Sequence, residues 1–291
     1  MKAIIFPGQA SQFQGMGKDL FESSELARTY FKKANEIMGF DLSKVMFEGS
    51  DEELKETLVT QPSVFLFSYL KYLLEASEME KSAVAGHSLG EFTALVAAGC
   101  LSFEEGLNLV KIRATAMQKA CEDHPGTMAA VVGLEDDVVE EVCNSLSEIV
   151  IAANFNCPGQ IVISGSLEGI EAAEPILQEK GAKRVIRLAV GGAFHSPLMQ
   201  SAEEELKAAI EAVDFQSPDC PIYQNVSAQA ERDPAIIQKQ LVSQLTSPVR
   251  WTQTMHNMLD DGIEEFVECG GKVLSGFVKR VNRKIPTTPI I

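Results

Sequence analysis

The sequence has few residues of the kinds that build covalent or metal-bound frameworks. Its six cysteines are spread over 291 residues without a C-x-x-C pair, and its four histidines do not cluster. This spacing indicates neither a disulfide framework nor a zinc site. We therefore expect reduced, mostly buried cysteines and no metal ion.

Basic residues are also scarce. The chain has 25 lysines and arginines against 41 aspartates and glutamates, a formal net charge of −16. Because binding of nucleic acid depends on a basic footprint, this balance argues against a nucleic-acid partner, although it does not exclude a smaller anionic ligand. Residues 180–187 and 272–284 are locally basic, and each is either attractive to an acidic partner or ordinary solvated surface.

Long hydrophobic runs are absent, since none approaches the roughly 20 residues that a membrane span needs. Residues 1–7 lack the apolar stretch and cleavage site of a signal peptide. The hydrophobic fraction of 45% and the charged fraction of 23% are ordinary for a globular protein. We expect a cytoplasmic monomer that does not associate with membranes.

The most informative stretch is residues 82–91, SAVAGHSLGE. Its small apolar residues predict a buried strand, and Gly86 and Gly90 let this strand and a following helix pass close together, while the turn between them exposes the hydroxyl of Ser88. Unpaired N–H groups at the helix N-terminus can stabilise an oxyanion. The pattern predicts a nucleophile elbow and acyl transfer; the alternative is a tight turn in which Ser88 is only an N-cap.

The rest of the chain predicts an α/β fold. Residues 2–6 form a strand that runs into the Gly-rich loop 7–17, which we expect beside the elbow because ligands bind at the carboxyl ends of parallel strands. Residues 127–188 show the order βαββαβ, typical of a ferredoxin-like module. We predict an α/β-hydrolase-like parallel-sheet core, residues 1–124 and 192–291, with an inserted ferredoxin-like subdomain, residues 125–191. Further helices are expected near 18–37, 51–59, 63–76, 197–213, 234–245 and 251–261 and from 273, and strands at 221–225 and 264–268.

A serine nucleophile needs a base, usually histidine. We assign this role to His195, which lies in a Gly-rich loop between a predicted strand and a predicted helix. His87 adjoins the serine and points elsewhere, so we expect a packing or supporting role, while His124 and His256 have no special setting. Acidic residues between Ser88 and His195 lie mostly in the inserted segment, which suggests that something else, such as a backbone carbonyl, orients the histidine.

A helix from residue 103, with a capping box of Ser102 and Glu105, places one charge on an otherwise apolar face. That charge is Arg113. A buried arginine must be paired, because an unmatched buried charge costs several kcal/mol or more. Its partner is either a structural carboxylate or a carboxylate of the substrate, held bidentately.

With these residues placed, the chain resembles the malonyl-CoA:acyl carrier protein transacylases of fatty-acid synthesis and the related acyltransferase domains of polyketide synthases. The resemblance runs essentially end to end. It rests on FPGQ at 6–9, GHSLGE at 86–91, Arg113 with Met117-Gln118, NFNCPGQ at 154–160, AFHS at 193–196, and Gln244 before PVRW at 248–251.

The resemblance implies a role for each of these residues. Ser88 would take the malonyl group from malonyl-CoA and His195 would act as base and then acid, in a ping-pong reaction that ends on the phosphopantetheine thiol of acyl carrier protein, without a cofactor. Arg113 would hold the malonyl carboxylate. The backbone N–H groups of Gln9 and Leu89 would form the oxyanion hole, the backbone carbonyl of Gln244 would orient His195, and Asn156 and His87 would be supporting residues.

One motif departs from the family pattern. The family's Gly-Pro-Gly is here Cys269-Gly270-Gly271, and loss of the proline predicts a looser loop. The alternatives that remain are a trans-acting polyketide-synthase acyltransferase, a serine thioesterase or esterase that passes the acyl group to water, and a noncatalytic scaffold. The AFHS loop resembles the malonyl-selecting form, which favours malonyl as the substrate.

Overall fold

Short apolar strands pair in parallel to form the main sheet. The computed structural model describes residues 1–291, and its six-stranded sheet has the order β10-β9-β1-β2-β7-β8, with every pair parallel except β7–β8. A sheet covered on both faces needs continuously apolar strands, and the first strand, KAIIF, meets that need. The strands are β1 (Lys2–Phe6), β2 (Ala83–Gly86), β7 (Ile222–Tyr223), β8 (Ala230–Glu231), β9 (Glu265–Cys269) and β10 (Thr287–Ile290).

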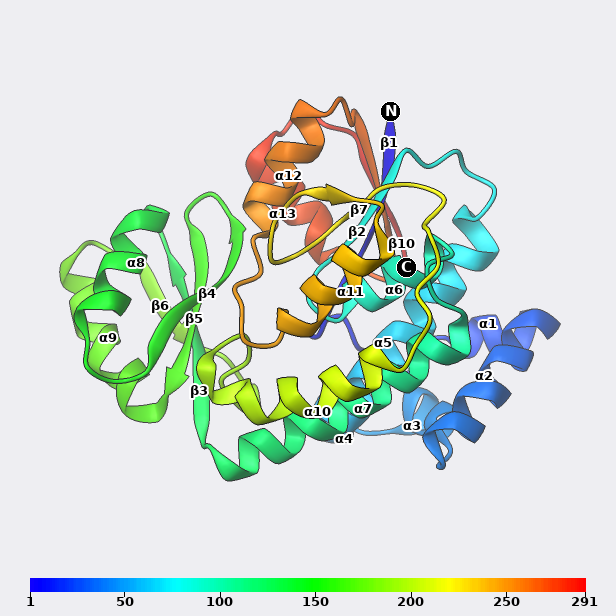
Figure 1. Ribbon diagram of the computed structural model, residues 1–291, viewed down its shortest axis with the longest axis horizontal. Helices are drawn as coiled ribbons and strands as arrows, with labels where there is room; N and C mark the ends of the chain where they lie inside the picture. Colours follow the sequence, from blue (N-terminus) through cyan, green and yellow to red (C-terminus); the bar gives the residue numbers. More distant parts are fainter.

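Helices cover both faces of this sheet (Figure 1). They are α1 (Lys18–Ser23), α2 (Glu25–Met38), α3 (Leu42–Glu48), α4 (Asp51–Lys55), α5 (Thr57–Lys71), the π-helical turn η1 (Tyr72–Ala76), α6 (Gly90–Ala97), α7 (Phe103–Asp123), the 3₁₀ turn η2 (Pro197–Met199), α10 (Gln200–Glu211), α11 (Pro234–Ser243), α12 (Trp251–Asp260) and α13 (Val273–Val281). Ile4 and Phe6 of β1 belong to the hydrophobic cluster that includes α2, α5, α6 and α7. Ala3 and Ile5 point the other way, into a cluster with α12 and α13. The architecture is therefore three-layered, with a parallel sheet between two layers of helices.

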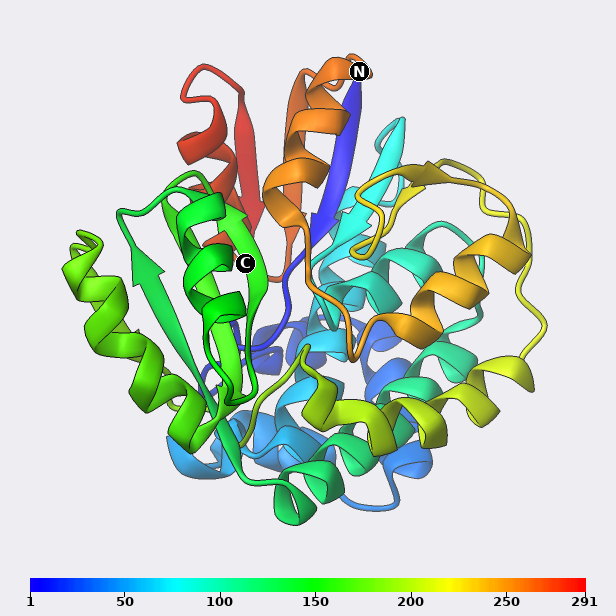
Figure 2. The ribbon, with the colours of Figure 1, turned by 60° about the vertical axis from the view of Figure 1, so that its left-hand side comes forward.

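A second sheet stands to one side of the first (Figure 2). Its strands are all antiparallel, in the order β4-β5-β3-β6. Two helices pack on it around a separate hydrophobic cluster. The elements along the chain are β3 (Gly126–Val132), α8 (Asp136–Ser145), β4 (Val150–Cys157), β5 (Gln160–Ser166), α9 (Leu167–Glu179) and β6 (Arg184–Arg187), the sequence of elements that the pattern predicts.

Some predicted boundaries are wrong, for local physical reasons. The helix expected over 18–37 is broken at Ser24, whose extended backbone and side chain cap α2. Pro62, expected to lie between two helices, lies inside α5, where almost every neighbouring residue is buried and packing outweighs the missing backbone hydrogen bond. Elements that the sequence did not indicate are the short ones: α3, β8 and the edge strand β10, which contains Pro289.

The loop at Cys269–Gly271 is held more firmly than the loss of proline predicts. Gly270 has φ +93°, a conformation that favours glycine, and its N–H donates to the carbonyl of Ile290 at 2.8 Å. The buried carboxylate of Glu268 accepts hydrogen bonds from the N–H groups of Leu274 and Ser275 at the start of α13. These contacts fix the loop between the sheet and α13.

Candidate active site

Ser88 lies on the sharp turn between β2 and α6. Its φ of +52° is a left-handed conformation that non-glycine residues rarely adopt, as a nucleophile elbow requires. Strand and helix touch at the two flanking glycines: a Cβ on Gly86 would lie 1.9 Å from the carbonyl of Gly90, and a Cβ on Gly90 would lie 2.1 Å from the carbonyl oxygen of Phe6. The glycine spacing predicted from the sequence is thus a steric requirement.

We expect Gly86→Ala to destabilise the protein by about 3 kcal/mol or more, because a methyl group must be accommodated against backbone that cannot move aside. Urea unfolding measures the effect. Gly276→Ala is the matched control, since a Cβ there meets no atom within 4 Å and the residue is in a helix with ordinary φ, so it should be neutral or slightly stabilising. Equal stability of both variants would contradict the close-approach argument.

The loop after β1 packs directly against the elbow. A Cβ on Gly8 would lie 2.6 Å from the carbonyl oxygen of His87 and 3.7 Å from the nitrogen of Leu89. The backbone N–H groups of Gln9 and Leu89, both at this junction, donate to no acceptor in the protein. Free N–H groups beside a serine hydroxyl can receive an oxyanion.

The structure brings His195 to the serine. The Nε2 atom of His195 lies 2.7 Å from the Oγ of Ser88, and its Nδ1 lies 2.9 Å from the backbone carbonyl oxygen of Gln244. His195 is buried and no carboxylate contacts it, so a backbone carbonyl occupies the position that an acid holds in a Ser-His-Asp triad. His124 and His256 are exposed and form no hydrogen bond with Ser88, His195 or Arg113.

His87 contacts Asn156 and Trp251 rather than the hydroxyl of Ser88. Its Nε2 lies 2.8 Å from the Oδ1 of Asn156, and its ring packs against Trp251 with centroids 5.5 Å apart. Burial lowers the pKa of His87 to about 4, so this imidazole is neutral at physiological pH.

Arg113 is fully buried and reaches the nucleophile. Its guanidinium donates to the Oγ of Ser88 at 3.0 Å, to Oε1 of Gln61 at 2.7 Å and to Oε1 of Gln244 at 3.2 Å. Its Nε has no partner, and no carboxylate lies within 4 Å of the guanidinium. Of the two partners that the sequence left open, the internal carboxylate is therefore absent, and a buried charge faces the serine with neutral amides around it.

Electrostatics at the site follow from burial. Burial, and next the charge of Arg113, lower the pKa of His195 to about 3. Burial also lowers the pKa of Arg113 to about 9 and raises that of Glu91 to about 7. His195 is therefore a neutral hydrogen-bond acceptor toward Ser88, as a base must be before it takes a proton.

Some residues of the site escaped sequence reasoning. Gln61 contacts Arg113, and Asn225 spans the elbow, accepting from the N–H of Ser88 at 2.6 Å and donating to the carbonyl of Gly86 at 2.6 Å. Glu91 is the last residue of the GHSLGE motif, but the sequence alone indicates no role for it. Neutral amides carry no periodicity or charge signal, and no spacing rule links residues so far apart in the chain.

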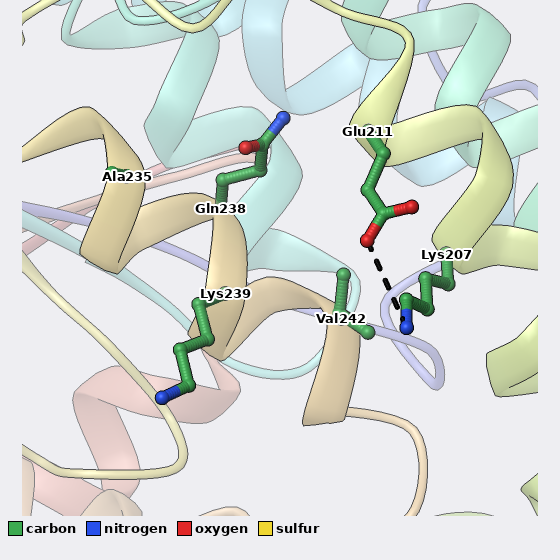
Figure 3. A pocket seen from close by; sticks show the side chains of 6 residues that line it. All are labelled: Lys207, Glu211, Ala235, Gln238, Lys239 and Val242. Carbon is green, nitrogen blue, oxygen red and sulfur yellow. Dashed lines mark ion pairs between the residues drawn. The ribbon is translucent and has the colours of Figure 1, made fainter.

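A cleft of about 520 Å³ opens in front of Ser88, between the two sheets. The loop after β1, the strands β3 to β5 and the start of α13 all contribute to it. No aspartate, glutamate or arginine lines it, and Lys55 is its one lysine. A smaller cavity of about 230 Å³ between α10 and α11 shares no residue with this cleft; it contains the Lys207–Glu211 ion pair (Figure 3).

No group of three or more His, Cys, Asp or Glu side chains is placed to hold a metal ion, and all six cysteines are free, five of them buried. None of the helices has both the length and the hydrophobicity needed to cross a bilayer.

A parallel-sheet fold with a serine elbow, a histidine and a buried arginine is an arrangement suited to acyl transfer. The chain belongs to the acyl transferase family, whose domain matches residues 3–271. A malonyl CoA-acyl carrier protein transacylase of Bacillus subtilis (strain 168) is 43% identical over 99% of this chain and 92% of its own length. The structure of an acyl-carrier-protein S-malonyltransferase from Burkholderia pseudomallei is 40% identical, with a TM-score of 0.93 over 99% of this chain and 95% of its own. A malonyl-transacylase solved in complex with a type II polyketide-synthase acyl carrier protein is 35% identical, with a TM-score of 0.95 over 99% and 95% of the two chains.

Proposed function

We propose that this protein is an [acyl-carrier-protein] S-malonyltransferase, which moves a malonyl group from CoA to the phosphopantetheine thiol of acyl carrier protein for fatty-acid synthesis. The observation that carries the proposal is the buried guanidinium of Arg113, 3.0 Å from the Oγ of Ser88 and without an internal carboxylate partner. A site with an unpaired buried cation beside a nucleophile selects an acyl group that carries its own carboxylate.

In the first half-reaction, the Oγ of Ser88 attacks the thioester carbonyl as its proton passes to the Nε2 of His195. The N–H groups of Gln9 and Leu89 receive the oxyanion of the tetrahedral intermediate. When the intermediate collapses, the C–S bond breaks and the imidazolium returns the proton to the departing CoA sulfur. The product is a malonyl ester of Ser88.

The second half-reaction is the reverse with another thiol. His195 takes the proton of the phosphopantetheine thiol, and the thiolate attacks the ester carbonyl. The C–O bond to Ser88 then breaks, and the imidazolium returns the proton to the Oγ of Ser88. The carbonyl of Gln244, 2.9 Å from Nδ1, holds the imidazole in one orientation through both steps.

Malonyl binding also helps the base. The charge of Arg113 is one cause of the low pKa of His195. A malonyl carboxylate paired with the guanidinium offsets that charge, so the imidazole becomes a better proton acceptor when the correct acyl group is bound.

Arg113→Ala tests the proposal. We expect acylation by malonyl-CoA to fall about 100-fold, the scale of a lost buried charge pair, while acylation by acetyl-CoA persists. The adducts formed from malonyl-, methylmalonyl- and acetyl-CoA are weighed by intact-protein mass spectrometry. Wild-type protein that prefers acetyl-CoA would contradict the role given to Arg113. Wild-type protein that releases the acyl group to water without a carrier thiol would favour an esterase.

We further propose that residues 125–191 are a ferredoxin-like subdomain inserted into an α/β-hydrolase-like core of residues 1–124 and 192–291. The strand order β4-β5-β3-β6 and the separate hydrophobic cluster support this division. The chemistry proposed here uses only protein side chains and backbone, and we propose no cofactor. The cytoplasmic location and the monomeric state stay predictions from the sequence.

A further inference from the structure

Glu91 is a buried carboxylate near the nucleophile that the proposed reaction does not use. It lies in the first turn of α6, three residues after Ser88, and is 1% exposed. It has no ion-pair partner within 4 Å. A carboxylate held in such a place costs free energy unless several donors satisfy it.

Three donors converge on this carboxylate. The side chain of Gln224 donates to Oε1 at 3.2 Å, and the backbone N–H of Asn225 donates to Oε2 at 3.2 Å. The shortest bond comes from Nε2 of Gln244, 2.8 Å from Oε2. Two of these donors also hold Ser88: Asn225 accepts from its N–H, and Gln244 donates to its carbonyl at 3.0 Å.

The hydrogen bonds of the Gln244 side chain fix which way its amide points. The carbonyl of Ser88 can only accept, so the amide atom that faces it is the nitrogen, which also lies 2.8 Å from Oε2 of Glu91. The amide oxygen then faces the guanidinium of Arg113, which can only donate. Rotation of this amide by half a turn would place an NH₂ group against a cation.

We propose that Glu91 is a positioning residue that sets acyl selectivity. By accepting the hydrogen bond from Gln244, it keeps the amide oxygen of that residue on Arg113, and so keeps the guanidinium aimed at the malonyl carboxylate. Its carboxyl group lies one amide away from the guanidinium, so it holds Gln244 without pairing with Arg113 and blocking the substrate. This inference rests on the function proposed above.

The geometry separates this role from general support of the site. The side-chain amide of Gln244 reaches Arg113, whereas its backbone carbonyl orients His195. Loss of Glu91 therefore disturbs the grip on the acyl carboxylate more than the serine–histidine pair. An acyl group without a carboxylate should be affected little.

The test compares single-turnover acylation by malonyl-CoA and by acetyl-CoA in two variants. Glu91→Gln keeps the shape but offers one oxygen to three donors, and we expect malonyl acylation to fall about tenfold, with a raised half-saturating concentration, while acetyl acylation stays within about threefold. Glu91→Met removes every acceptor and should lower malonyl acylation about 100-fold. If Glu91→Met does not fold, the malonyl-to-acetyl ratio of Glu91→Gln alone tests the proposal.

Glu268→Gln is the matched control. Glu268 is also a fully buried carboxylate that accepts two backbone N–H groups, but it does not contact Gln244. We expect it to lower the thermal midpoint without changing the malonyl-to-acetyl ratio. An unchanged malonyl-to-acetyl ratio in the Glu91 variants, whether both rates fall equally or neither falls, would overturn the inference. A wild-type protein that forms no malonyl adduct would instead overturn the proposed function itself.

Discussion

Ser88→Ala is expected to remain unmodified when it is incubated with malonyl-CoA. The Oγ of Ser88 is the one hydroxyl that both His195 and Arg113 contact, at 2.7 and 3.0 Å. Without it no acyl ester can form, and transfer to the carrier stops because the ping-pong route has no other entry. Intact-protein mass spectrometry after a short incubation measures the result.

The control for this variant is Ser23→Ala, which removes an exposed hydroxyl on α1 and should acquire the malonyl group as the wild type does. Both proteins should unfold at similar urea concentrations. A malonyl adduct on Ser88→Ala in the wild-type amount would place the nucleophile elsewhere and remove the basis of the mechanism.

His195→Ala should slow acylation about 1,000-fold, within the range that general-base catalysis supplies. The serine keeps its place on the elbow, but nothing takes its proton. Stopped-flow or quench-flow acylation measures the loss, and His256→Ala, an exposed histidine on α12, is the control with an unchanged rate. A drop of less than about tenfold would mean that another group is the base.

The same histidine predicts an unusual pH profile for the wild type. A base works when it is unprotonated, and the pKa of His195 is lowered from 6.5 to about 3. The profile of kcat/KM, which reports the free enzyme, should therefore show no loss between pH 8 and about 5 from this group. The profile of kcat should fall at a higher pH, because bound malonyl offsets the charge of Arg113 and raises the pKa of the imidazole. Overlapping profiles would contradict that coupling.

Much of this site could be predicted from the sequence because single local patterns encode it. The elbow follows from two glycines around Ser88, and Arg113 stood out as the one charge on an apolar helix face that the structure buries completely. The choice of His195 followed from its loop, and the absence of an acid near it was inferred from where acidic residues lie along the chain. The four-stranded sheet followed from its βαββαβ order.

The rest depends on contacts between distant segments. Gln61 and Asn225 meet the site only because α5 and the segment after β7 pack against the elbow and Arg113. Their side chains break no local rule, so nothing in the neighbouring residues marks them. Helix periodicity shows that Arg113 is buried, but it does not show what pairs with the guanidinium. The partners depend on how α7 packs against α5, the elbow and the segment after α11.

Gln244 performs two tasks with two different groups: its main-chain oxygen orients His195, and its side chain contacts Arg113, Ser88 and Glu91. Every amino acid at position 244 brings the same carbonyl, so no point substitution deletes that contact with Nδ1, whereas any substitution changes the side chain that touches Ser88, Glu91 and Arg113. Variation at this position can therefore retune recognition of the acyl group while the proton-transfer pair keeps its alignment. The carbonyl also never ionises, so the histidine has no partner whose own titration could switch the enzyme off in acid.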